Sequence, residues 1–185
     1  MLDPARARAI RLVGFDVDGV LTDNGIHVAV DHGRRIEGKR FDAQDGVGLY
    51  LLRLAGLDVA WVSGRTSDAT ADRARELKVP HVIQDEGLGL KLPAVRGLLD
   101  RLGLSWGEFA FVGDDIADIP LLRRAGVALA VANAVPEVRA LAHEVTPRAG
   151  GFGAVRDAVE MLLRARGDWD RVLARYLEER GDRDD

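Results

Sequence analysis

Short apolar runs alternate with amphipathic segments along most of this 185-residue chain. The runs contain mainly valine, phenylalanine and other apolar residues, which is the pattern of strands that are covered on both faces. Five runs are predicted as strands, over residues 12–15, 59–62, 81–83, 109–112 and 127–131. Strands that alternate with helices form right-handed βαβ units. The sequence therefore predicts an α/β fold, a Rossmann-like parallel sheet with helices on both faces.

The segments between these runs carry apolar residues on one stripe at helical spacing. Helices are predicted over residues 47–54, 67–77, 92–102, 116–124, 136–142 and 154–166. Ser67 is a candidate N-cap for the second of them, because a serine side chain can accept a hydrogen bond from the first turn of a helix.

Residues 25–41 break the alternation. They read as two strands around a turn at 31–33, so a small β-hairpin inserted after the first strand is predicted there. Because no linker or repeat divides the chain, residues 1–185 are expected to form a single domain without a separate cap domain. Residues 167–185 are predicted as a C-terminal tail, whose apolar positions could face either its own domain or a neighbouring subunit.

Composition excludes several classes of function. Thirty acidic residues oppose 26 basic ones, and the net charge of −4 argues against a protein that coats nucleic acid. The chain contains no cysteine, which excludes a disulfide scaffold, a thiolate zinc site and a cysteine nucleophile. No apolar run approaches the roughly 20 residues of a membrane span, and no signal peptide is predicted. We therefore expect a cytoplasmic protein that binds neither nucleic acid nor membrane.

The strongest chemical signal is the run Asp16-Val17-Asp18-Gly19 at the end of the first predicted strand. Ligand sites in parallel α/β sheets lie beyond the carboxyl ends of the strands. Two carboxylates at that place repel each other unless a cation binds between them or one of them stays protonated. One could act as a nucleophile and the other as a general acid and base. The alternative is an Asp-Gly turn in which both acids cap a helix.

A second acidic group follows the fourth predicted strand, in Gly113-Asp114-Asp115-Ile116-Ala117-Asp118. Asp118 lies one helical turn after Asp114. Helix capping explains one acid at such a position comfortably and three poorly. Carboxylate oxygens are ligands that Mg²⁺ prefers, so the two acidic runs together indicate a divalent cation site.

Two further polar groups follow predicted strands. Ser63-Gly64-Arg65 ends the second strand, where a hydroxyl and backbone N–H groups could hold a phosphoryl oxygen and an arginine could bind an anion. Lys91 precedes the helix predicted over 92–102. Taken singly, the first group reads equally as an ordinary turn and the second as a solvent-exposed lysine. Parallel strands bring all four groups to one edge of the sheet, and the joint arrangement is much more specific than any part.

With these motifs in this order, the sequence resembles the haloacid dehalogenase-like phosphohydrolases and, within them, the 3-deoxy-D-manno-octulosonate 8-phosphate phosphatases. The resemblance runs from about residue 12 to residue 164. The closer match is carried by DVDGVLTD, the hairpin with FDAQDGVG after it, VSGR, LGLK, VGDD with Asp118, and RAGGFGAVRD. It implies a Mg²⁺-dependent phosphatase that acts on the phosphate ester of a keto sugar acid, with the octulosonate 8-phosphate as the first expectation.

The resemblance also implies a role for each acid. Asp16 would attack phosphorus and form an aspartyl phosphate. Asp18 would protonate the leaving sugar oxygen and would later deprotonate the water that hydrolyses the intermediate. Mg²⁺ would be held by Asp16, by the backbone carbonyl of Asp18 and by Asp114, where it would offset charge on the phosphoryl oxygens. Asp115 and Asp118 would not bind the metal themselves but would hold its ligands in place.

A substrate pocket follows from the same resemblance. Ser63 and Lys91 would hold the remaining phosphoryl oxygens, and Asp18 would also contact the substrate. Arg65 and Arg73 would line the pocket, where a guanidinium can bind the carboxylate of an octulosonate. A loop would line it as well, formed by Asp42, Ala43, Gln44, Asp45 and Gly46.

Two residues depart from the family pattern. Phe152 replaces the arginine of a Gly-Gly-Arg-Gly motif, and Tyr50 stands where another arginine is expected after the Asp-Gly loop. Both changes remove cations from where an acidic sugar would be recognised. Relatives that act on a nine-carbon keto sugar phosphate also vary in this region, so a phosphatase for a nine-carbon keto sugar acid phosphate is a second hypothesis.

Two non-enzymatic hypotheses remain, a phospho-acceptor such as a response-regulator receiver and a silent oligomerisation module of the same fold. In receivers the lysine comes last, whereas here it precedes the Gly-Asp-Asp run. A silent module would be expected to lose Asp16 or Asp18, and both are present. The resemblance also implies a homotetramer, in which hairpins pack together and C-terminal tails reach an adjacent active site.

Overall fold

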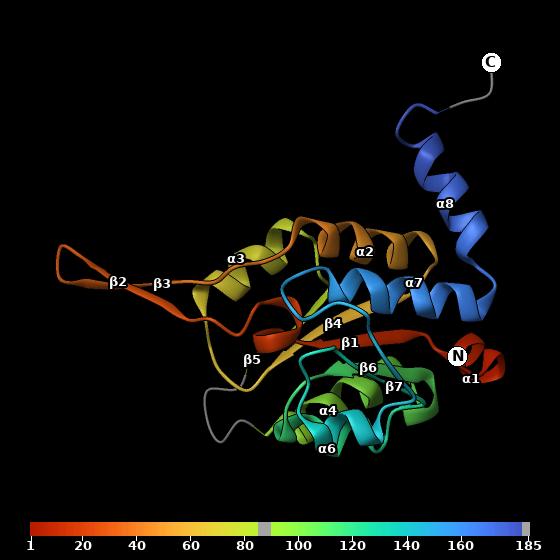
Figure 1. The fold of residues 1–185 in the computed structure, drawn as a ribbon, viewed down its shortest axis with the longest axis horizontal. Helices are drawn as coiled ribbons and strands as arrows, with labels where there is room; N and C mark the ends of the chain where they lie inside the picture. The colour runs from red at the N-terminus through yellow and green to blue at the C-terminus, as the bar shows by residue number, and fades with distance from the viewer. Residues whose placement is uncertain (85–89, 183–185) are drawn as a thin grey trace.

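A six-stranded parallel sheet organises the molecule, which we describe from a computed structural model over residues 1–84 and 90–182 (Figure 1). Strand β1 (Leu12–Asp16) is buried along its whole length and lies between β4 (Asp58–Ser63) and β6 (Phe109–Gly113). The outer strands are β5 (His81–Gln84) beside β4, then β7 (Val127–Ala130) and β8 (Glu144–Val145) beyond β6. The five predicted strands are confirmed. The sixth, β8, has only two residues, which is too short for a periodic pattern to reveal.

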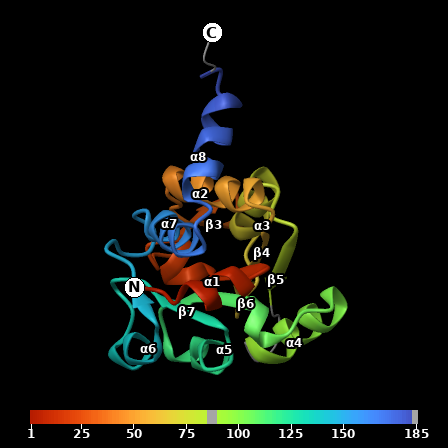
Figure 2. The same ribbon diagram turned by 90° about the vertical axis from the view of Figure 1, so that its right-hand side faces the viewer.

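Helices cover both faces of this sheet, as predicted (Figures 1 and 2). One side carries α2 (Ala43–Leu54), α3 (Asp68–Glu76) and α7 (Ala154–Arg166). The other carries α4 (Lys91–Leu102), α5 (Ile119–Leu122) and α6 (Pro136–Leu141), as Figure 2 shows. The core lies between these layers, and its largest fully buried side chains include Trp61, Phe15, Phe109 and Phe111.

The sequence pattern missed the first helix, α1 (Pro4–Ala9). The Asp3 carboxylate caps it by accepting hydrogen bonds from the N–H groups of Ala5 and Arg6. The guanidinium of Arg166, at the end of α7, donates to the carbonyls of Ala7, Arg8 and Ile10. The Asp-Pro pair at 3–4 was a usable start signal, because proline is favoured at the first position of a helix.

The extents of two predicted helices were wrong, and one predicted capping hydrogen bond is absent. Helix α2 begins four residues before position 47, because the Asp42 carboxylate accepts a hydrogen bond from the Gln44 N–H at 2.8 Å and starts the helix there. Residues 116–124 are not one helix, since a 3₁₀ turn over Ile116–Asp118 precedes α5. Ser67 does stand at the N-cap of α3, but its hydroxyl donates to Glu37 Oε1 at 2.9 Å and makes no capping hydrogen bond.

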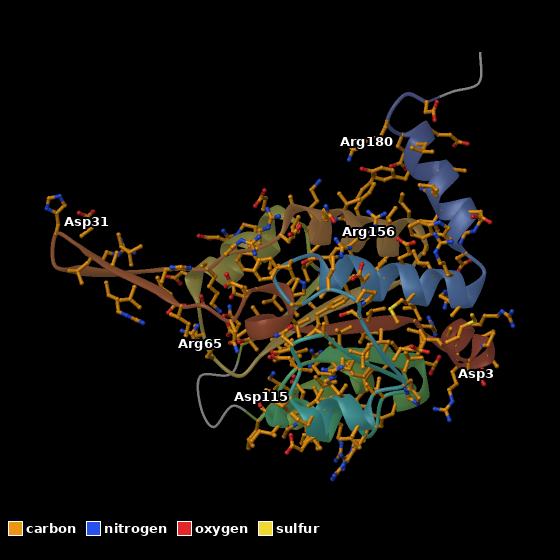
Figure 3. All side chains as sticks on the ribbon, viewed as in Figure 1. Asp3, Asp31, Arg65, Asp115, Arg156 and Arg180 are labelled. Atoms are coloured by element: carbon orange, nitrogen blue, oxygen red, sulfur yellow. The ribbon has the colours of Figure 1, made fainter. Side chains whose placement is uncertain are left out.

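The predicted hairpin is present as β2 (His27–Asp31) and β3 (Arg34–Gly38), joined antiparallel. His32 and Gly33 at its turn both have positive φ angles, 46° and 78°, as a two-residue type I′ turn requires. An isolated bridge between Thr22 and Phe41 closes the base. The hairpin extends well away from the sheet, with Asp31 near its tip (Figures 1 and 3).

The C-terminal segment forms α8 (Trp169–Glu178), which packs on α2 and α7 of its own chain and rises away from the sheet (Figure 2). The Tyr50 hydroxyl donates to the Glu179 carboxylate, and the Tyr50 and Tyr176 rings meet edge to face at 6.0 Å. Trp169 is buried at the start of the helix. Within residues 1–84 and 90–182, nothing forms a cap domain, and no helix there is long and apolar enough to cross a membrane.

Candidate active site

The strand order brings the predicted motifs together at one edge of the sheet. Asp16 ends β1, Ser63 ends the neighbouring β4, and Asp114 follows β6 on the other side of β1. Lys91 begins α4. A pocket of about 200 Å³ lies there, lined by Asp16, Asp18, Asn24, Ser63, Gly64, Arg65, Lys91, Asp114, Asp115 and Ala117. Arg65 and Asp115 mark this end of the sheet, near the base of the hairpin (Figure 3).

Three buried carboxylates form the centre of this site. One oxygen from each of Asp16, Asp114 and Asp118 lies within 4.8 Å of the others. The Lys91 ammonium donates to Asp16 Oδ1 at 2.6 Å and to Asp118 Oδ1 at 2.7 Å. Asp118 Oδ2 accepts from the backbone N–H groups of Asp114 at 3.0 Å and Asp115 at 3.4 Å. Asp118 therefore has an oxygen in the cluster itself, whereas it was predicted only to support the metal ligands.

Negative charge is in excess in this cluster. Burial raises the pKa of Asp16 well above its usual value, and Asp118 raises it further while Lys91 opposes the shift. Burial and Asp118 also raise the pKa of Asp114, to about 6. Burial lowers the pKa of Lys91, but Asp16 and Asp118 outweigh that effect and raise it overall. One ammonium thus faces three carboxylates.

The cluster fits a hard divalent cation. Asp114 Oδ1 is buried and has no hydrogen-bond partner among the described residues. Crowded carboxylates that lack compensating donors are stabilised by a bound cation, and Mg²⁺ prefers oxygen ligands of this kind. The site therefore offers the carboxylate oxygens that Mg²⁺ needs as ligands.

Backbone packing explains the glycine of the first motif. Gly19 has a φ of +93°, and a Cβ atom on it would lie only 2.0 Å from Asp114 Oδ2. The Asn133 side chain donates to the Gly19 carbonyl at 3.2 Å and accepts from the Gly150 N–H at 2.7 Å. Because Gly19 has no side chain, the two acidic runs can approach each other. The Asn133 side chain links the backbone of Gly19 to the Gly150-Gly151 stretch through these hydrogen bonds.

The remaining predicted residues of the pocket are already paired. The Lys39 ammonium lies 2.7 Å from Asp18 Oδ1, and Arg65 Nη1 lies 3.9 Å from Asp18 Oδ2. Arg65 also donates twice to the Glu37 carboxylate, at 3.0 and 2.8 Å. The Ser63 hydroxyl donates to the Arg65 carbonyl at 2.9 Å. Lys39 and Glu37, both at the base of the hairpin, were missed by the sequence analysis.

The predicted substrate loop does not line this pocket in the single chain. Asp42, Ala43, Gln44, Asp45 and Gly46 form the start of α2. Asp45 is buried, and its Oδ1 accepts from the Arg156 N–H at 2.8 Å, in the first turn of α7. Burial raises the pKa of Asp45 to about 7. Arg73, on α3, also lies outside the pocket lining and donates to Glu76 at 2.7 Å.

Phe152 and Tyr50, the two residues that depart from the family pattern, bring no cation into this pocket. The Arg40 guanidinium lies 4.3 Å from the centre of the Phe152 ring and donates to the Gly151 carbonyl. Tyr50 contacts α8. Three lining residues, Asn24, Gly64 and Ala117, were not among the predicted site residues; Asn24 has a φ of 68°, which asparagine tolerates better than most residues. Of the LGLK motif, Leu88 and Gly89 lie outside the described residues.

Comparisons with known proteins identify the family of this chain. The profile of haloacid dehalogenase-like hydrolases matches residues 90–158. The 3-deoxy-D-manno-octulosonate 8-phosphate phosphatase KdsC of Escherichia coli K12 is 38% identical over 173 residues, which cover 94% of this chain and 89% of KdsC.

Solved structures show the same relationship. The 3-deoxy-D-manno-octulosonate 8-phosphate phosphatase of Moraxella catarrhalis, solved with magnesium, phosphate and KDO, is 36% identical with a TM-score of 0.85, over 94% of this chain and 97% of that one. The cobalt-bound deoxy-D-mannose-octulosonate 8-phosphate phosphatase of Haemophilus influenzae is 33% identical with a TM-score of 0.79, over 88% and 92%. The chain therefore belongs to the 3-deoxy-D-manno-octulosonate 8-phosphate phosphatases, within the haloacid dehalogenase-like hydrolases.

Proposed function

We propose that this chain is a Mg²⁺-dependent phosphatase for a phosphorylated keto sugar acid, with 3-deoxy-D-manno-octulosonate 8-phosphate as its substrate. One observation carries the proposal. The cluster of Asp16, Asp114 and Asp118 around Lys91 lies next to Asp18, a further carboxylate that faces the same pocket. A site that only binds a metal does not need the Asp18 carboxylate. Phosphate ester hydrolysis does need a group that transfers a proton, and Asp18 can be that group.

The residues of the pocket divide the reaction into two displacements. A carboxylate oxygen of Asp16 attacks phosphorus, the bond to the sugar oxygen breaks, and Asp18 gives that oxygen its proton. Water then attacks the aspartyl phosphate, Asp18 takes a proton from it, and Asp16 is released. Ser63 and Lys91 hold phosphoryl oxygens. When bound by Asp16, the Asp18 carbonyl and Asp114, Mg²⁺ offsets the negative charge of the phosphoryl group.

A neighbouring subunit completes the site in this proposal. The pocket holds about 200 Å³, whereas pockets for small molecules typically hold roughly 300–1,000 Å³. The Asp42–Gly46 loop and Arg73 lie outside it. Val28, Val30 and Ile36 of the hairpin are 54%, 72% and 46% exposed, which favours contact with another copy. A homotetramer of single-domain chains, with active sites near subunit interfaces, accounts for these features; a cytoplasmic location stays a prediction.

A second candidate is a phosphatase for a nine-carbon keto sugar acid phosphate. It is favoured by Phe152 and Tyr50, which bring no cation to the pocket where the family pattern expects arginines. The chemistry at Asp16 and Asp18 is the same for both substrates.

A phosphate-release screen tests the proposal. The purified protein is assayed with eight- and nine-carbon keto sugar acid phosphates and with simple phosphate esters, before and after EDTA treatment and Mg²⁺ addition. We expect hydrolysis that EDTA stops and Mg²⁺ restores, fastest with the octulosonate 8-phosphate. Faster hydrolysis of a nine-carbon ester would select the second candidate. Metal-independent activity, or no hydrolysis of any ester, would contradict the proposal.

A further inference from the structure

Lysine is rare in this chain and concentrated at the site. Only three of the 26 basic residues are lysines. Lys91 is buried against Asp16 and Asp118, the side chain of Lys39 is 0% exposed beside Asp18, and Lys78 is exposed on the surface. Taking an ammonium out of water costs several kcal/mol unless close partners compensate for it. A lysine with a fully buried side chain against a reacting carboxylate therefore needs an explanation.

The hairpin delivers Lys39 to the site. Lys39 directly follows β3, and its ammonium lies 2.7 Å from Asp18 Oδ1 and donates to the hydroxyl of the fully buried Thr70 at 3.1 Å. Glu37 lies two residues earlier and binds Arg65. Residues two apart on extended backbone point to the same side. The base of the hairpin thus brings one cation to Asp18 and one anion to Arg65, and both of these partners line the pocket.

The contact with Lys39 gives the two carboxylate oxygens of Asp18 different surroundings. Oδ1 is buried and contacts the ammonium as an ion pair at 2.7 Å without forming a hydrogen bond, while Asp18 itself lines the pocket. An ammonium that Thr70 also holds can shift little, so the Asp18 carboxylate can rotate little. A group that transfers a proton needs this restraint, because a displacement of about 1 Å can lower a rate about 100-fold.

We propose that Lys39 is a positioning residue for phosphate ester hydrolysis, which holds Asp18 by Oδ1 so that Oδ2 faces the leaving oxygen of the substrate. The inference rests on the proposed function, because it assumes that Asp18 transfers the proton. It also gives the inserted hairpin a part in catalysis, in addition to any part in assembly.

Leaving-group dependence tests the inference. The variant Lys39→Met is compared with wild type and with Lys78→Met, which removes the exposed lysine. For each protein, kcat/KM is measured with the best alkyl phosphate from the screen and with p-nitrophenyl phosphate. The alkoxide of the first needs a proton to leave, whereas p-nitrophenolate leaves without one, so only the first reaction depends on how Asp18 is aimed.

We expect Lys39→Met to lower kcat/KM about 10- to 100-fold for the alkyl phosphate and less than about threefold for p-nitrophenyl phosphate. Lys78→Met should change neither. Equal losses with both substrates would show a merely structural role and overturn the inference, as would unchanged rates.

Circular dichroism shows whether each variant folds. If Lys39→Met does not, Lys39→Gln carries the test, since its amide can still donate a hydrogen bond. We expect a smaller loss that is again selective for the alkyl phosphate, and an unselective loss or none overturns the inference. A wild-type protein that hydrolyses neither ester refutes the proposed function instead, so the two failures are distinguishable.

Discussion

Replacing Asp45 with asparagine should remove a pH dependence from the stability of this protein. The Asp45 carboxyl is buried between α2 and α7, and its Oδ1 accepts from the Arg156 N–H at 2.8 Å. Gly153, at the N-cap of α7, has no side chain that could cap this helix, so Asp45 does so from α2. Asparagine keeps the accepting oxygen and the shape of the side chain but cannot ionise.

The magnitude follows from the pKa of Asp45. Burial raises it from 3.8 to about 7, although the hydrogen bond from Arg156 opposes the shift. Because the pKa is higher in the folded state, the stabilisation is fully present below pH 3.8 and is lost as pH rises through about 7. A shift of about three units corresponds to about 4 kcal/mol, of which about 2.5 kcal/mol falls between pH 5 and pH 8.

Urea unfolding at pH 5 and pH 8 measures this difference. We expect the free energy of unfolding of wild type, relative to Asp45→Asn, to fall by about 2.5 kcal/mol between the two pH values. Asp100→Asn, at an exposed position on α4, is the matched control and should follow wild type. If Asp45→Asn changes with pH in parallel with wild type, the carboxyl is ionised in the folded protein at pH 5 and the reasoning is wrong.

Three further perturbations address the site and the hairpin. Asp16→Asn should lower phosphate release more than about 1,000-fold, because the nucleophile is lost. Circular dichroism should show an intact fold, because the substitution reduces buried charge; retained turnover would exclude Asp16 as nucleophile. Gly19→Ala places a Cβ atom 2.0 Å from Asp114 Oδ2 and should raise the Mg²⁺ concentration for half-maximal activity at least about tenfold, and an unchanged Mg²⁺ titration would contradict that crowding. Val30→Asp puts a charge on the exposed hairpin and should dissociate the oligomer in sedimentation velocity, whereas a monomeric wild type would refute the assembly.

Local patterns predicted the sheet because each strand carries its own evidence of burial. The run at β1 is buried at every position, as its apolar residues indicate. Elements without such a pattern were missed. Strand β8 has two residues, and the start of α2 depends on the single side chain of Asp42.

The candidate site was predictable where chemistry and strand ends coincide. Asp16, Ser63 and Asp114 follow neighbouring strands, and a parallel sheet places such residues at one edge. Lys91 was predicted at the same edge, but the individual side-chain pairings were not predictable in the same way. Lys91 contacts Asp16 across 75 positions of the chain, and Arg156 contacts Asp45 across 111. No local periodicity encodes which side chains meet over such separations.

The sequence by itself thus determined the α/β architecture, the hairpin and the acids that face one sheet edge, since these depend on hydrophobic spacing and on residue types at strand ends. Tertiary structure decided which acids share a cluster, that Asp45 supports α7 in place of lining the pocket, and that Lys39 reaches Asp18. These outcomes depend on distances of a few ångströms between elements. Only the packing of the whole chain sets those distances.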